Sequence, residues 1–168
     1  MKRTNFSLLI LTGVFLCMLP IHTVLASDHP DFTGKWVLNE EKSTLGERMF
    51  FAAVELTVSQ DGTILKIVRI RTGRDGQMRT MTEELNTNGE ESVTERENGS
   101  TTSKAAWTEE SNALHIKYEI DFNRQGETVT MNRSETWTLA EQASILTIES
   151  VSSSPRGENS VTLVYDKK

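Results

Sequence analysis

The stretch from 127 to 139 carries charged side chains on the same face as apolar ones. Successive side chains of a β-strand point to opposite faces, and one face of this stretch holds only Thr, Asn and Ser, which we expect to face water. The other face is then predicted to point inward, and it carries Val129, Met131, Arg133, Glu135, Trp137 and Leu139. An arginine fork can hold a carboxylate or another oxyanion through two hydrogen bonds. This face therefore offers candidate residues for a polar binding site.

A second inward arginine is predicted from a hairpin. Asp61-Gly62 is a favoured two-residue hairpin loop, and as such it would pair Val58 with Leu65. Residues that pair across two strands share a face. Because Val58 belongs to an apolar, inward face, the residues that follow on the same face as Leu65 are Ile67, Arg69 and Arg71.

The predicted inward charges indicate a cavity. An unpaired charge in a dry core costs several kcal/mol, so Arg69, Arg133 and Glu135 at interior positions suggest a wet, partly polar space inside the fold. Two alternatives remain open at this point. These side chains could lie at the mouths of a barrel, or a bulge could shift their face by one residue.

Aromatic residues supply the predicted apolar walls of this space. We expect Trp36, Tyr118 and Trp137 to lie among them. Tyr118 and Tyr165 sit on apolar faces and could also donate their hydroxyls beside the arginines. The alternative for both tyrosines is ordinary core packing with one satisfied hydrogen bond.

Composition and motifs exclude several classes of function. The net charge of −6 argues against nucleic acid, which needs clustered Lys and Arg. The sequence has no Ser-His-Asp order, no H-E-x-x-H, no P-loop and no Gly-x-Gly-x-x-Gly. His115 has no second histidine nearby in sequence to complete a zinc or haem site. We therefore expect no enzyme, no cofactor and no metal centre in the barrel. The acidic pairs Glu83-Glu84 and Glu90-Glu91 are expected to be solvated.

Residues 1–26 resemble a cleaved secretory signal. Lys2 and Arg3 precede an apolar run of residues 6–19, and Val24-Leu25-Ala26 fits a small-x-small cleavage site. The run is short of the ~20 residues that a membrane span needs. Removing this leader removes the single cysteine and two bases, so the charge of −6 becomes −8 for residues 27–168. We expect one exported domain without a membrane span.

The remaining chain alternates with period two between turn residues such as Asp61-Gly62 and Asn88-Gly89. This pattern predicts antiparallel strands at 32–38, 54–59, 63–71, 78–85, 91–97, 101–107, 113–121, 127–139, 145–152 and 160–166. Short links join antiparallel neighbours, so the predicted fold is all-β: an up-and-down meander of about 8–10 strands. Closure into a barrel would remove the exposed edges, and a β-sandwich is the alternative. Thr44 to Glu47 fits a capping box, which predicts a short helix after the first strand.

The string Phe32 to Ser43 (FTGKWVLNEEKS) contains the Gly-x-Trp pattern of lipocalins at Gly34 and Trp36. It resembles the start of small exported bacterial lipocalin-like proteins, most of them without an assigned function. The meander is similar to the wider calycin group, closed barrels that hold a small ligand inside. The resemblance implies that Trp36 packs across the closed end. The arginine that usually stacks on this tryptophan is absent from 161–166, and so is the Arg-x-Tyr pair of fatty-acid-binding proteins.

Two functions are consistent with these observations. The first is an exported, non-enzymatic protein that binds a small apolar or amphipathic ligand inside the barrel, through Trp36, Arg69, Tyr118, Arg133, Glu135 and Trp137. The second is an exported protein-interaction or inhibitor module that uses the barrel surface and holds no internal ligand. Fold alone does not decide between them.

Cleavage after Ala26 has a consequence that can be measured. The chain would then begin at Ser27 and carry His29 as its third residue, and an amine, two amides and an imidazole form a square-planar site for Cu(II) or Ni(II). We expect intact-mass measurement of the secreted protein to give a chain that starts at Ser27 and binds one Cu(II). A different first residue would remove the metal prediction, and a His29→Ala variant is the control.

Overall fold

The structure is a computed structural model and describes residues 29–45, 52–108, 112–124, 126–155 and 157–168. The predicted leader and its cleavage site lie outside these ranges. Ten strands follow one another along the chain: β1 (Gly34–Leu38), β2 (Ala53–Asp61), β3 (Ile64–Thr72), β4 (Met78–Asn86), β5 (Asn88–Arg96), β6 (Gly99–Trp107), β7 (Leu114–Arg124), β8 (Glu127–Ala140), β9 (Ile145–Ser154) and β10 (Gly157–Lys167). Each predicted strand therefore has an observed counterpart.

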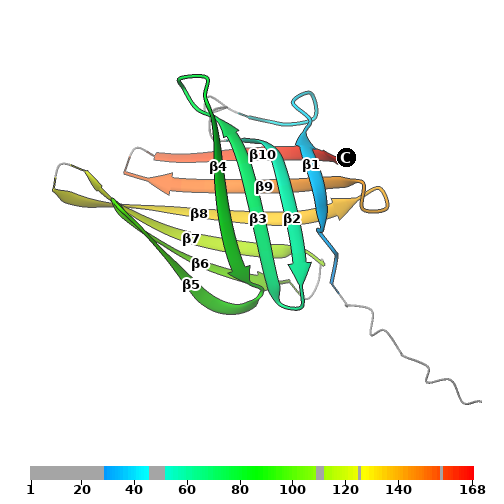
Figure 1. Cartoon of the computed structure of the whole chain (residues 1–168), viewed down its shortest axis with the longest axis horizontal. Coiled ribbons are helices and arrows are strands. Elements are labelled where there is room, and N and C mark those ends of the chain that lie inside the picture. Colours follow the sequence, from blue (N-terminus) through cyan, green and yellow to red (C-terminus); the bar gives the residue numbers. More distant parts are fainter. Residues whose placement is uncertain (1–28, 46–51, 109–111, 125, 156) are drawn as a thin grey trace, which may run out of the picture.

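All ten strands belong to one antiparallel sheet, in the order β4-β3-β2-β1-β10-β9-β8-β7-β6-β5 (Figure 1). Strand β1 pairs with β2 on one side and with β10 on the other, so the first and last strands are neighbours. The sheet ends at β4 and β5, which leaves the barrel open between them. The predicted all-β meander is confirmed as a nearly closed barrel, and the continuous sheet argues against a β-sandwich.

The predicted short helix falls largely on 46–51, which lie outside the described residues. Its expected N-cap, Thr44, is described and forms a β-bridge with Thr162. Each residue donates its backbone N–H to the carbonyl of the other, at 2.7 and 3.0 Å. No helix long and apolar enough to cross a membrane occurs in the described part of the chain.

The hairpin between β2 and β3 turns one residue later than predicted. Asp61 pairs with Ile64, so the loop is Gly62-Thr63, and Val58 pairs with Ile67 rather than with Leu65. Gly62 takes φ +57°, which suits the first position of a tight primed turn. The partner of Val58 moves by two residues, and because side chains alternate with period two, the inward face is unchanged. The conclusion about Arg69 therefore survives the wrong register.

The inward residues change from apolar to polar along the barrel. Leu114, Trp137 and Ile148 lie side by side across β7, β8 and β9 and are fully buried. Two residues before Trp137 on β8, Glu135 pairs with Ser150 of β9. This layering results from the register of the pairs, and it gives the barrel one end with a packed apolar core and one end lined by polar groups.

Trp36 lies in the packed end. Its ring is fully buried, and its indole N–H donates to the carbonyl of Phe32 at 2.9 Å. The ammonium of Lys167 lies 5.0 Å from the centre of the Trp36 ring. A lysine thus occupies the stacking position in which the resemblance to lipocalins implies an arginine. Lys167 lies beyond the predicted strand 160–166, because β10 continues to this residue.

Gly99 opens β6 where the β5–β6 hairpin contacts β7. It has φ +145°, and a Cβ there would overlap the carbonyl oxygen of Asp121. We expect Gly99→Ala to lower the free energy of unfolding by about 2–4 kcal/mol, from backbone strain and overpacking. Gly62→Ala is the control, because a Cβ at Gly62 meets nothing within 4 Å, and it should cost only about 1–2 kcal/mol. Urea unfolding measures both free energies, and an equal loss of stability in Gly99→Ala and Gly62→Ala would contradict this expectation.

Candidate functional site

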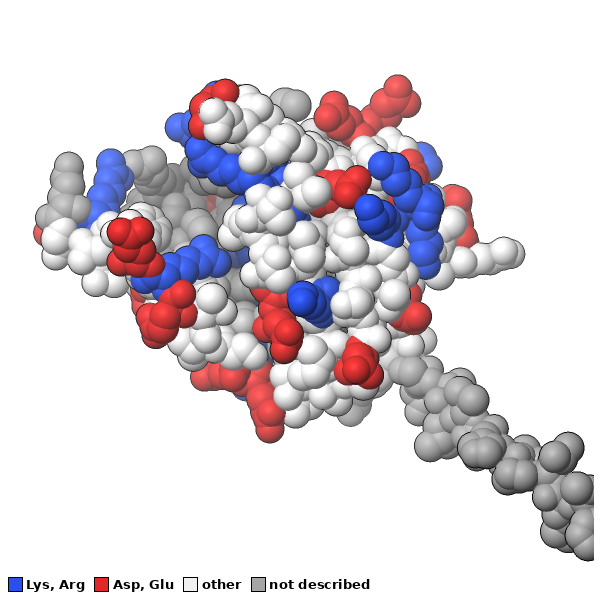
Figure 2. All heavy atoms as spheres, viewed as in Figure 1, with Lys and Arg blue, Asp and Glu red and all other residues white. Residues whose placement is uncertain are grey.

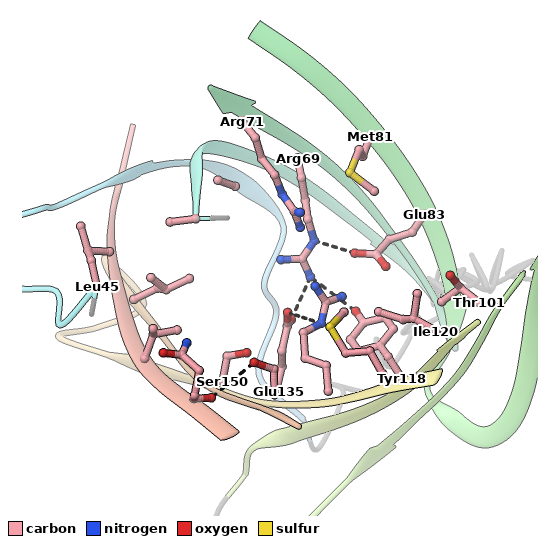
Figure 3. A pocket seen from close by; sticks show the side chains of 18 of the residues that line it. Leu45, Arg69, Arg71, Met81, Glu83, Thr101, Tyr118, Ile120, Glu135 and Ser150 are labelled. Atoms are coloured by element: carbon pink, nitrogen blue, oxygen red, sulfur yellow. Dashed lines mark hydrogen bonds and ion pairs between the residues drawn. The ribbon is translucent and has the colours of Figure 1, made fainter. Parts of the chain in front are cut away.

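A cavity of about 280 Å³ occupies the polar end of the barrel. Strand β3 contributes Arg69 and Arg71, and strand β8 contributes Arg133 and Glu135 from the facing wall (Figure 3). The volume lies just below the usual range for small-molecule pockets. The predicted polar interior is therefore a real space and not a set of charges at the barrel mouths.

Arg69 joins the two walls of this cavity. Its Nε donates to Glu83 on β4 at 2.6 Å, and its Nη2 donates to Glu135 on β8 at 2.8 Å. The same Nη2 lies 3.4 Å from the hydroxyl of Tyr118 on β7. Only 4% of the Arg69 side chain is exposed. The two carboxylates offset the cost of burying this guanidinium, which would be several kcal/mol if it were unpaired.

Glu135 is the buried anion of the network. One of its oxygens accepts from Arg69 and from the indole N–H of Trp137, the latter at 3.0 Å. Burial alone would raise its pKa, but Arg69 and Arg133 attract the carboxylate and bring that pKa to about 2. Glu135 is therefore ionised at neutral pH and serves as a fixed negative charge.

Arg71 and Arg133 carry polar atoms that the network leaves unsatisfied. The Nε of each is buried and has no hydrogen-bond partner among the described residues. Arg133 Nε lies 3.4 Å from Glu135 as an ion pair, and the Arg133 guanidinium stacks 4.1 Å from the centre of the Tyr118 ring. Burial, then repulsion from Arg69 and Arg133, lowers the pKa of Arg71 to about 10. Both side chains line the cavity.

The rest of the lining is divided between apolar and hydroxyl-bearing residues. Leucine, alanine, valine, isoleucine and methionine side chains form the apolar part, at Leu45, Ala52, Ala53, Met81, Ile120, Met131, Val161 and Leu163. The hydroxyl and amide groups come from Thr82, Thr101, Ser150, Ser152 and Asn159. Figure 3 shows Leu45 on the opposite side of the space from Thr101 and Ile120. A molecule with both apolar and polar parts matches this lining.

Four of the six predicted site residues meet in one cluster: Arg69, Tyr118, Arg133 and Glu135. The two tryptophans do not line the cavity. Trp137 lies beneath it and donates to Glu135, whereas Trp36 belongs to the packed end of the core. Their prediction as cavity walls is corrected accordingly. Period-two alternation gives the face of a residue but not its depth along the barrel.

Most lining residues were not among the predicted site residues, including Arg71, which was predicted to point inward but not to belong to the site, and the polar residues Glu83, Arg96 and Thr101. Glu83 was expected to be solvated, but it points inward to Arg69 while its neighbour Glu84 points outward. The pairing of Glu83 with the inward Ile67 would have revealed this, had the register of β3 and β4 been known. Arg96 and Thr101 come from β5 and β6, whose alternation in sequence is weak.

The cluster is suited to binding rather than to proton transfer. Burial, with Glu135 and Glu83 nearby, raises the pKa of Tyr118, so neither Tyr118 nor the ionised Glu135 exchanges a proton near neutral pH. His115 lies outside the cavity lining and contacts Thr136 at 3.3 Å. Within the described ranges, no three metal-ligating side chains gather into a group. His29 stacks on Trp107, with 4.5 Å between ring centres, and its predicted metal site stays a prediction.

The fold and site define a ten-stranded barrel with a charged internal cavity. No protein-family model matches the chain, and no curated protein matches its sequence. Among solved structures, the zebrafish ileal bile acid-binding protein complexed with cholic acid is similar, with a TM-score of 0.47 and 14% sequence identity. The match covers 82% of this chain and 98% of that protein.

The low pKa of Glu135 predicts a pH-dependent stability. A carboxylate whose pKa is about 2 in the folded state and 4.5 ordinarily stabilises the fold above about pH 4.5 and loses that effect as the pH falls toward 2. The loss corresponds to roughly 3 kcal/mol. We expect Glu135→Gln to be less stable at pH 7 and to have a flatter profile from pH 5 to pH 2.

Urea unfolding at each pH measures this difference. Glu149→Gln, an exposed position on β9, is the matched control and should keep the profile of the original chain. An unchanged slope in Glu135→Gln would contradict the role of Glu135 as the buried counter-charge.

Proposed function

We propose that this chain is an exported, non-enzymatic protein that binds a small amphipathic ligand inside its barrel. The observation that carries the proposal is Arg71, a largely buried cation that faces the cavity next to two other arginines. Its Nε is buried without a hydrogen-bond partner in the described structure. A charge buried without a counter-charge is costly, and the Arg71 guanidinium lines the cavity, so its position supports binding of an anionic molecule there.

Arg71 differs in this respect from Arg69. Two carboxylates, Glu83 and Glu135, offset the charge of Arg69, and its place in the fold is explained by that network. No described ion pair offsets Arg71 at 4.0 Å or closer. Its charge therefore destabilises the folded chain, and binding of an anionic group would remove that cost. Residues kept for binding at the expense of stability are common at functional sites.

The apolar part of the ligand is assigned to the other side of the cavity. Leu45 precedes β2, and Val161 and Leu163 belong to β10. Burying an apolar group there contributes about 25 cal/mol per Å². A short alkyl chain with an acidic end is thus the simplest molecule that suits both parts of the lining.

The alternative function, a protein-interaction or inhibitor module, was expected to have a filled barrel. Its supporting feature here is the exposure of Met78 and Val93, at 59% and 61%, on the edge strands β4 and β5. The cavity with its unsatisfied donors favours the ligand-binding function. Export is supported by residues 1–26, whose charge and hydropathy pattern is that of a secretory signal.

Replacing Arg71 tests the proposal in two opposite directions. We expect Arg71→Gln to raise the free energy of unfolding by about 1 kcal/mol, because it removes repulsion from Arg69 and Arg133. We expect the same change to weaken the binding of octanoate about tenfold, a loss of about 1.4 kcal/mol. Thermal unfolding and isothermal titration calorimetry measure the two effects.

Arg79→Gln is the matched control, since Arg79 is exposed on β4 and pairs with Asp75 outside the cavity. It should leave octanoate binding unchanged. Octanoate binding that is equal in Arg71→Gln and the original chain would contradict the proposed function, and so would the failure of octanoate, octyl phosphate and octyl sulfate all to bind.

A further inference from the structure

The described lining of the cavity has an excess of positive charge. Its charged members are four arginines, Arg69, Arg71, Arg96 and Arg133, and two glutamates, Glu83 and Glu135, which leaves a net charge of +2. The chain as a whole carries −6, so this excess is local and opposite to the overall charge. A ligand with one negative charge would neutralise half of it.

The excess is concentrated on the arginines that the internal network does not satisfy. Arg69 is held by both glutamates, and Arg133 shares Glu135 with it. Arg71 has no such partner at salt-bridge distance among the described residues. Burial, and after it repulsion from Arg69 and Arg133, lowers the pKa of Arg71. Figure 3 shows Arg71 pointing from β3 into the same space that Arg69 and Glu135 enter from facing walls.

Two further polar residues, Thr101 and Arg96, belong to the lining. Thr101 on β6 is 7% exposed, and its hydroxyl lacks a hydrogen-bond partner in the described structure. Arg96 belongs to β5, one of the two strands at the opening of the barrel, and contributes to the lining from an exposed position. Figure 2 shows Lys and Arg side chains beside the hollowed face near β4 and β5. Positive charge at a cavity mouth raises the rate at which an anion enters.

We propose that the ligand's polar group is a doubly charged oxyanion, a phosphate monoester, held in the cavity by Arg71 and Arg133 with Arg96 at the entrance. This inference rests on the proposed function and deepens it by naming the class of head group. A phosphate monoester offers three acceptor oxygens and up to two negative charges. Its charge therefore matches the excess of +2 in the described lining, and its three oxygens can accept from more than one arginine. A carboxylate carries one charge and two oxygens.

The second ionisation of phosphate makes the proposal testable by pH. Its pKa is about 6, so roughly a tenth of a phosphate monoester is doubly charged at pH 5 and nearly all of it at pH 8. Histidine is the side chain that ordinarily titrates in this range, and the charged and titratable groups of the described lining are arginines, glutamates and Tyr118. We expect the affinity for octyl phosphate to rise about tenfold from pH 5 to pH 8.

Octyl sulfate is the matched probe, since it has the same alkyl chain and a single charge throughout this range. Its affinity should stay constant, and it corrects for any titration elsewhere in the protein. Arg71→Gln should bring the ratio of octyl phosphate affinities at pH 8 and pH 5 toward one, while Arg79→Gln should keep it. Isothermal titration calorimetry at pH 5 and pH 8 measures the affinities of both octyl compounds for the original chain and for the two variants, each without residues 1–26.

The outcomes separate this inference from the proposed function. If octyl phosphate and octyl sulfate both bind but show the same pH dependence, the doubly charged head group is wrong and the amphiphile-binding function stands. If inorganic phosphate binds as tightly as octyl phosphate, the anion site stands and the amphiphile-binding function is wrong. If octyl phosphate, octyl sulfate and octanol all fail to bind, both are overturned.

Discussion

The buried guanidinium of Arg69 is the interaction on which the polar end of this barrel depends. It connects β3 to β4 through Glu83 and to β7 and β8 through Tyr118 and Glu135. These strands belong to facing walls of a sheet that is open between β4 and β5. Charge-assisted hydrogen bonds of this kind hold both distance and direction. The width of the cavity is consequently set by a charged contact, whereas the packed end is set by apolar side chains.

The register between β8 and its neighbouring strands explains why one end of the barrel is apolar and the other is polar. Strand β8 carries Trp137, Glu135 and Arg133 on one inward face, and its antiparallel neighbours place Ile148, Ser150 and Ser152 beside them in turn. The step from Trp137 to Glu135 along β8 thus moves from an apolar layer to a charged one. On the β9 side the partners follow the same change of polarity, whereas on the β7 side Glu135 lies beside the buried Ile116.

The cavity combines a satisfied and an unsatisfied part. Around Arg69, the charges are balanced and the hydrogen bonds are made, which stabilises one arrangement of the walls. Around Arg71, a positive charge is retained without a described ion pair, and both burial and repulsion from Arg69 and Arg133 disfavour it. The two arginines are only two residues apart on β3. Their different surroundings separate a residue that maintains the site from one that is available to a ligand.

Much of the fold and part of the site could be predicted from the sequence. Alternation with period two located all ten strands and placed Arg69, Arg133 and Glu135 inside, and it did so even though the turn at Gly62 was placed one residue too early. The sequence by itself determines which face each side chain takes, because that depends only on its neighbours along one strand. The tertiary structure alone decided that Glu83 meets Arg69 and that Trp36 lies away from the cavity. Depth along the barrel and the partners across it depend on how distant strands are staggered, and no local pattern of residues fixes that stagger.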